Sequence, residues 1–121
     1  MTKTKINFNS KLKSISDYWS PKVIAELNDY QFKLAKIKGE FIWHKHNDTD
    51  EAFIVIEGNI EIELVDSTIE LSEGEMFIVP KGAKHKPIAR GEAHIMLIEP
   101  RGVKNTGDIN NELTAKNDIW I

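Results

Sequence analysis

The chain has no cysteine among its 121 residues, and this absence removes several kinds of site from consideration. Disulfide bonds, thiolate metal sites and a cysteine nucleophile are all excluded. A chain without cysteine is compatible with a reducing compartment, and we expect a cytoplasmic location.

Long apolar runs are absent as well. The longest, such as residues 52–56 and 95–98, are far too short to span a bilayer. The first thirteen residues carry lysines with no apolar stretch after them, so we expect no secretory signal. The net charge is only −3, with both signs mixed along the chain. We therefore expect neither nucleic acid nor a membrane as a partner.

Short apolar segments separated by turn residues predict an all-β fold. Ile60, Ile62 and Leu64 alternate with Glu61 and Glu63, which is the pattern of a half-buried strand. No segment has a sustained helical period, and the spacing leaves no room for the helices of an α/β protein. Eight to ten short strands predict an antiparallel sandwich or barrel. The clearest expected strands are residues 22–27, 30–37, 41–46, 52–56, 60–65, 68–71, 76–79, 85–89 and 94–99.

The two ends of the chain differ from this central pattern. We expect an N-terminal arm at 1–20, a barrel at 21–100 and a C-terminal tail at 101–121 that packs on the barrel. Within the arm, residues 12–19 predict a short helical turn or an irregular segment. Trp19 in the arm and Trp120 in the tail are expected to cover the barrel or a neighbouring subunit.

Three of the four histidines and one glutamate gather in two stretches of the chain. His44 and His46 are two residues apart, so on a strand they lie on the same face. Glu51 opens an apolar run, and His85 follows a Pro-Lys-Gly loop. Neutral imidazoles and a carboxylate suit divalent transition metals, and one ion could bind all four residues. The competing interpretation is a surface histidine pair next to solvated acids.

The spacing of these residues resembles the two motifs of the cupin superfamily. The first reads Gly39, four residues, His44-x-His46, four residues, Glu51, six residues, Gly58, and the second reads Gly74, five residues, Pro80-x-Gly82, two residues, His85. The resemblance is closest to small single-domain cupins described as mannose-6-phosphate isomerase-like. There are two departures: cupins usually have five residues before the first histidine, and Ala89 stands where an asparagine is common.

This resemblance implies a fold, a metal site and an assembly. The fold would be a single-domain, all-β, double-stranded β-helix (jelly-roll barrel). His44, His46, Glu51 and His85 would hold one divalent transition metal ion per chain, which could be Fe, Mn, Ni, Co, Cu or Zn. Four protein ligands leave positions open for water, substrate or dioxygen. Cupins of this kind pair through edge strands and N-terminal arms, so we expect a homodimer.

Five further residues are candidates for a pocket near the ion. His94 shares parity with Met96 and Ile98 on the last expected strand, which would direct it into the barrel. An exposed or satisfied histidine at a strand start is the competing interpretation. The candidate pocket residues are Ile42, Phe53, Val55, Met76 and His94. No catalytic residue beyond the ligands is assigned.

Three functions remain open from the sequence. The first is a metalloenzyme acting on a small organic molecule by dioxygenase, isomerase or related chemistry at the metal. The second is a non-catalytic, metal-containing protein that binds or senses a small ligand, which the scarcity of other acid and base groups favours. The third is a metal with only a structural role. Whether the protein is an enzyme is thus undecided at this level.

Overall fold

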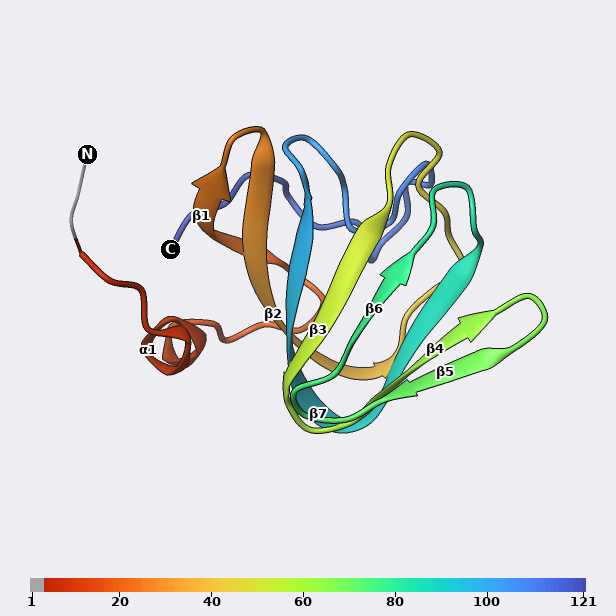
Figure 1. Cartoon of the computed structure of the whole chain (residues 1–121), viewed down its shortest axis with the longest axis horizontal. Coiled ribbons are helices and arrows are strands. Elements are labelled where there is room, and N and C mark those ends of the chain that lie inside the picture. Colours follow the sequence, from red (N-terminus) through yellow and green to blue (C-terminus); the bar gives the residue numbers. More distant parts are fainter. Residues whose placement is uncertain (1–3) are drawn as a thin grey trace.

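The computed structural model describes residues 4–121, and the regular structure in this part of the chain consists of antiparallel strands and one short helix (Figure 1). The main sheet has the order β1-β2-β7-β3-β6, while β4 pairs with both β5 and β7. This confirms the expected all-β, jelly-roll class. The elements are α1 (Phe8–Lys13), β1 (Lys22–Leu27), β2 (Tyr30–Glu40), β3 (Glu51–Glu57), β4 (Ile60–Leu64), β5 (Thr68–Leu71), β6 (Met76–Val79) and β7 (His85–Pro100).

β7 joins the two halves of the barrel. Its first half pairs with β4, and its second half lies between β2 and β3 (Figure 1). Two separate strands were expected here, but the backbone pairing with β2 continues through the bend. β2 bends with it, through a register shift between Ile37 and Gly39, where Gly39 has a φ of 87°. Glycine adopts this conformation without steric cost, which explains the residue at this position.

The segment between β2 and β3 also differs from the expectation. Residues 41–46 were expected to form a strand, yet they are irregular apart from one isolated bridge, His44 to His85. The segment still runs beside the start of β7, because Phe41 donates its backbone N–H to Pro87 O at 3.0 Å. Individual backbone hydrogen bonds, and not a continuous strand pairing, thus hold this segment beside β7.

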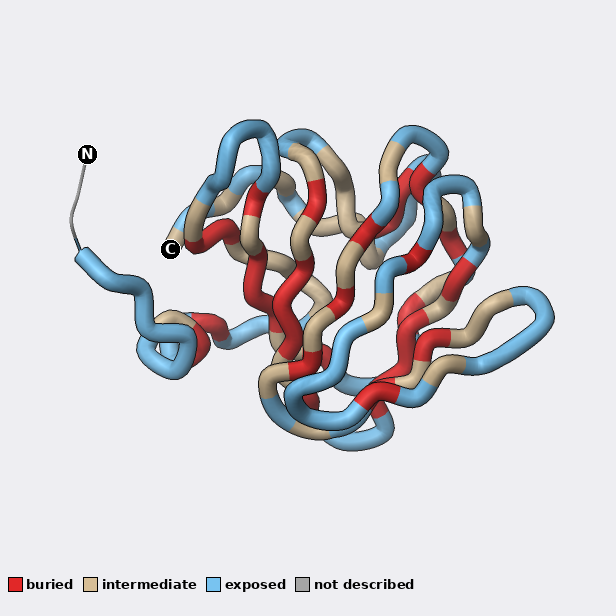
Figure 2. The backbone as a smooth tube through the Cα atoms, in the orientation of Figure 1, coloured by how far each residue is buried: buried red, intermediate tan, exposed pale blue. Residues whose placement is uncertain are grey.

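The core lies inside the barrel, where inward-facing residues of six strands meet. Buried stretches follow these strands, and the tip of the β4–β5 hairpin is exposed (Figure 2). Alternation along each strand produces this arrangement, since every second side chain faces inward. The buried core residues are Ala35, Ile37, Phe53, Val55, Ile60, Ile62, Leu71, Val79, Ala89, Ala93, Ile95 and Leu97.

A second apolar cluster lies on the outer face of the sheet, under α1. Leu12 and Ile15 pack there against Ile24, Leu34 and Met96. The helix begins earlier than expected, because the Asn7 side chain accepts a hydrogen bond from Ser10 N at 3.0 Å and caps it. Among the described residues, no helix has the length and apolarity needed to cross a membrane.

Candidate metal centre

The two histidine-bearing segments are joined through their backbones. His44 N donates to His85 O at 3.0 Å, and His85 N donates to His44 O at 2.9 Å. The Pro80–Gly82 loop is tied to the same place, since Gly82 N donates to His46 O at 2.8 Å. The backbone therefore fixes the separation of the two segments before any side chain is considered.

The structure brings together the four residues that the sequence singled out as ligands. Glu51 is the first residue of β3 and His85 the first of β7, while His44 and His46 belong to the irregular segment. All four are buried, and one potential ligand atom from each lies within 4.8 Å of the others. Among the described residues this is the group of four that could hold a metal ion.

Backbone carbonyls determine which nitrogen of two histidines faces the cluster. His44 Nδ1 lies 2.9 Å from Ile42 O, and His85 Nδ1 lies 2.9 Å from Ala83 O. A carbonyl oxygen only accepts, so each Nδ1 carries the proton. The Nε2 atoms of both rings are then free to donate a lone pair to an ion.

Three buried polar atoms converge on one point and have no hydrogen-bond partner. They are His46 Nε2, Glu51 Oε1 and His85 Nε2. His46 Nε2 lies 3.3 Å from Glu51 Oε1, and His85 Nε2 lies 3.5 Å from the same oxygen. Buried polar atoms without partners are costly. A divalent cation among them would satisfy all three, so the residues present fit a metal ion.

Burial prepares these groups to bind a cation. Desolvation, followed by repulsion from His85, lowers the pKa of His44 to about 4, so its ring is neutral near pH 7. Burial by itself would raise the pKa of Glu51. The proximity of Glu99 and then of His46 and His85 outweighs it, and the pKa of Glu51 lies well below its usual value. A neutral imidazole and an ionised carboxylate are the states that coordinate metal.

A buried ion pair lies directly behind the cluster, and sequence reasoning missed it. Lys33 Nζ donates to Glu99 Oε2 at 2.7 Å and to Val103 O at 3.1 Å, and both charged side chains are almost fully buried. Burial and then the charge of Glu51 raise the pKa of Glu99 well above its usual value, although Lys33 acts in the opposite direction. The cluster is thus backed by a second carboxyl group.

A small cavity adjoins the cluster on the inner side. It measures about 30 Å³, its walls are mostly apolar, and His44 and Glu51 are the cluster residues in its lining. Trp19 from the N-terminal arm and Asn105 from the C-terminal tail close it. Phe53 lines this cavity, as the sequence suggested.

The structure places the other candidate pocket residues elsewhere. Val55 is buried in the core. The Ile42 carbonyl faces the His44 ring, and Ile42 does not line the cavity. The expectation for Met76 is corrected, because its side chain is 53% exposed on the outer face of β6. His94 is corrected too: it lies between Glu57 and Glu92, at 3.1 and 2.8 Å, away from the cavity.

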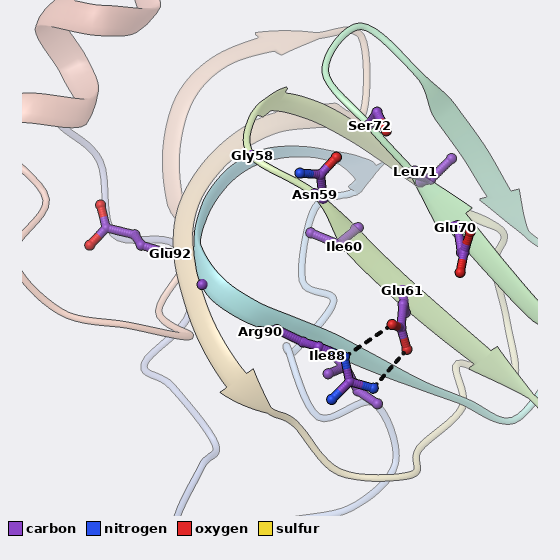
Figure 3. Close-up of a pocket in the computed structure, with 11 residues that line it drawn as sticks. Gly58, Asn59, Ile60, Glu61, Glu70, Leu71, Ser72, Ile88, Arg90 and Glu92 are labelled. Atoms are coloured by element: carbon purple, nitrogen blue, oxygen red, sulfur yellow. Dashed lines mark hydrogen bonds and ion pairs between the residues drawn. The ribbon is translucent and has the colours of Figure 1, made fainter.

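Larger hollows lie on the surface. One of about 420 Å³ is bordered by the β4–β5 hairpin and the bend of β7, where the Arg90 guanidinium makes two hydrogen bonds of 3.2 and 3.3 Å to Glu61 (Figure 3). None of the four cluster residues lines it. Another of about 210 Å³ lies over the C-terminal tail and includes His46 alone of the four. Of these hollows, the cavity under Trp19 is the one lined by two of the four cluster residues.

Comparison with known proteins identifies the fold family. The cupin domain family matches residues 32–100. A crystal structure of a cupin-2 domain containing protein from Shewanella frigidimarina is 58% identical, with a TM-score of 0.78. It covers 79% of this chain and 94% of that one.

Two curated relatives are similar over shorter parts of their own lengths. An uncharacterized protein of Bacillus subtilis, YdbB, is 42% identical over 64 residues, which are 52% of this chain and 57% of that protein. A putative dioxygenase of Saccharolobus solfataricus is 26% identical over 85% of this chain and 28% of that protein. The matched part thus spans less than two thirds of either curated relative. The narrower likeness to mannose-6-phosphate isomerase-like cupins stays a prediction. With two thirds or more of both chains aligned to a cupin at more than half identity, and the family matched over most of the barrel, this chain belongs to the cupin family.

Proposed function

We propose that the protein binds one divalent transition metal ion per chain and acts at that ion on a small organic molecule. The ligands are His44, His46, Glu51 and His85. The observation that carries the proposal is the convergence of three buried, unpartnered polar atoms within this group. A protein interior rarely retains such atoms unless something binds them.

Each of these ligands would bind the ion through a defined atom. His44 and His85 offer Nε2, because the carbonyls of residues 42 and 83 hold the protons on Nδ1. Glu51 offers Oε1. The backbone bridge between His44 and His85 orients two ligands at once. A bound ion of this kind supplies a Lewis acid or a redox centre.

The apolar cavity has a separate role, which is to limit the access of water. It excludes bulk water from the inner side of the site, which strengthens electrostatic interactions there. Buried Lys33 and Glu99 hold the back of the site against the C-terminal tail, since Lys33 also contacts Val103 O. We propose that this support orients the Glu51 carboxylate.

Dioxygenase or isomerase-type chemistry is the reaction class that we favour. The similarity to a putative dioxygenase over 85% of this chain supports it. Purified protein, loaded in turn with each candidate metal, should convert at least one compound in a panel of small organic acids, sugar derivatives and phenols. Fully loaded protein that converts none of them would contradict the enzymatic proposal.

The second candidate is a metal-containing protein that binds or senses a small ligand without chemistry. The lining of the cavity favours it, because His44 and Glu51 are its only titratable side chains and both are proposed ligands. Native mass spectrometry distinguishes the two candidates: a ligand that is retained and released unchanged supports binding, and a converted one supports catalysis.

We also propose a homodimer that forms through the outer face of the sheet. Two rows of apolar residues cross β2, β7, β3 and β6 there, and β6 is an edge strand of the sheet. Met76 and Ile78 on β6 are 53% and 50% exposed. A continuous apolar face ending at an open edge is a typical protein interface. Leu34 and Met96 in these rows lie under α1. The part of the rows that we call the outer apolar face comprises Phe32, Ala52, Ile54, Met76, Ile78 and Ile98.

The remaining predictions concern location and chain organisation. A cytoplasmic location stays a prediction, and so do the boundaries of the arm at 1–20, the barrel at 21–100 and the tail at 101–121. Limited proteolysis checks the boundaries, since exposed segments are cleaved before the barrel.

A further inference from the structure

The N-terminal arm places an aromatic ring at the inner side of the candidate metal centre. Trp19 lines the small cavity that His44 and Glu51 also line. The cavity of about 30 Å³ has room for about one or two water molecules. By comparison, an apolar cavity that binds benzene measures about 150 Å³. With Trp19 in place, no aromatic ring fits beside His44 and Glu51.

Four contacts hold Trp19 in this position. Its backbone N–H donates to Lys36 O at 2.9 Å, and its indole Nε1–H donates to Lys38 O at 2.9 Å. Its carbonyl accepts a hydrogen bond from Asn105 Nδ2 at 2.9 Å. The ring stacks on Phe41 with 4.7 Å between centroids. Trp19 is therefore a fixed wall of the cavity, tied both to β2 and to the C-terminal tail.

The backbone of Trp19 is strained. Its φ is 60°, in the left-handed region that bulky side chains rarely adopt. A glycine would make the same turn without strain. Strain of this kind persists where the surroundings fix it, and it clusters at ligand sites. The turn itself does not explain a tryptophan here, whereas closure of the cavity does.

We propose that Trp19 determines the size of the ligands that reach the candidate metal centre. It excludes ligands with an aromatic ring and admits groups of a few non-hydrogen atoms, such as dioxygen, azide or a short carboxylate. This inference rests on the proposed function, and it narrows the substrate class to small aliphatic compounds.

Cobalt-loaded protein provides the test. Elemental analysis first establishes that Co²⁺ is bound. Azide, formate and benzoate are then titrated into wild type, Trp19→Gly, Trp19→Phe and Trp120→Gly, and the visible absorption of Co²⁺ is followed. Trp120 is the matched control, because its ring is half exposed and its Nε1 contacts only Asp118 in the tail.

Azide and formate should shift the cobalt spectrum in all four proteins. Benzoate should shift it in Trp19→Gly with an apparent affinity at least tenfold higher than in wild type, Trp19→Phe and Trp120→Gly. Benzoate binding to wild type as tightly as formate overturns the proposal, and this result needs no variant. Equal benzoate affinities in wild type and Trp19→Gly overturn it as well.

A second measurement does not depend on the metal. Free indole should raise the melting temperature of metal-free Trp19→Gly, because it refills the space left by the side chain, and it should leave wild type unchanged. If Co²⁺ fails to bind to any of the proteins, the proposed metal function fails. The indole result still decides whether Trp19 closes a cavity, and no selective effect of indole would overturn that point.

Discussion

His44 and His85 form a reciprocal pair of backbone hydrogen bonds, and their rings lie 4.2 Å apart between centroids. This is the isolated bridge that joins the irregular segment after β2 to the start of β7. Two proposed ligands from distant parts of the chain are thus set in register by the main chain, and their side chains need little freedom to meet an ion.

Removal of one imidazole should abolish tight metal binding. His46→Ala is expected to weaken the affinity by at least about 100-fold, because it removes one of four ligands. His94→Ala is the control and should change the affinity little, since His94 lies between Glu57 and Glu92. Isothermal titration calorimetry measures both. Equal losses in the two variants would show that the ion binds elsewhere.

The stability of the metal-free protein should fall with acidification because of His44. Burial lowers the pKa of His44 to about 4 from its ordinary value of 6.5. Between these values the unfolded chain takes up a proton that the folded protein does not, so stability rises with pH in this window. From about pH 7 to about pH 5, wild type should lose up to about 2 kcal/mol more than His44→Asn.

The comparison with His44→Asn is necessary because Glu99 acts in the opposite direction. Its pKa is raised, so the folded protein holds a proton that the unfolded chain loses above its ordinary pKa. The variant retains this contribution, and the difference between the two proteins isolates His44. Urea unfolding at each pH provides the free energies, and parallel pH profiles would refute the assignment.

Loss of Lys33 should strongly destabilise the barrel. Lys33→Met leaves Glu99 Oε2 and Val103 O buried without their hydrogen-bond donor, and we expect a cost of about 3 kcal/mol in the free energy of unfolding. Lys86→Met is the control and should cost far less, because its partner Glu40 is exposed. The double variant Lys33→Met/Glu99→Gln should recover part of the loss. No recovery would mean that the cost comes from packing alone.

The tail is expected to tolerate no side chain at Gly107. A Cβ there would overlap Lys45 O and approach His46 Nδ1, and the φ of Gly107 is 62°. Gly107→Ala should therefore lower stability by several kcal/mol and weaken metal binding. Gly102 has a φ of 93° but open space around it. Gly102→Ala should therefore lower stability by only about 1 kcal/mol. Equal losses would show that backbone strain, and not contact with His46, matters.

The outer apolar face should control assembly. Ile78→Glu places a charge on the open edge of the proposed interface and should convert a dimer to a monomer at micromolar concentration. Val65→Glu is the control, because Val65 is 80% exposed in the β4–β5 turn. Light scattering coupled to size exclusion gives the mass. A monomeric wild type would refute the proposed homodimer.

The spacing of histidines and glycines allowed the fold to be predicted, because turns and ligands recur at defined intervals along a chain of short strands. The convergence of His44, His46, Glu51 and His85 agrees with that spacing. Phe53, one of the candidate pocket residues, lies in the lining of the cavity. These features can be recognised in short stretches of sequence, because the two-residue period of a strand shows which side chains share a face.

The direction of side chains on the long strands could not be read in the same way. On β7 both faces are apolar, since one faces the core and the other the outer cluster. Alternation then does not show which face is inward. Counting in steps of two from His85 reaches Ile95, Leu97 and Glu99, which are buried, and this count would have identified Glu99. Counting in steps of two from His94 selects Met96 and Ile98, which lie on the outer face.

The contacts of Trp19 were beyond sequence reasoning for a different reason. The sequence suggested only that it covers the barrel or a neighbouring subunit. Its hydrogen bonds to Lys36, Lys38 and Asn105 join parts of the chain that are far apart. Such pairings depend on how the arm and the tail wrap the finished barrel, and no local pattern encodes them.

The two ends of β7 have one further consequence. His85 begins the strand and Glu99 lies one residue before its end, and both side chains meet Glu51. A slip of one residue in either half would turn one of them away to the opposite face. Uptake of the proposed metal ion during refolding should therefore report correct barrel closure: we expect a chain that has paired both halves of the strand in the native register to capture the ion, and a misaligned chain of equal strand content not to.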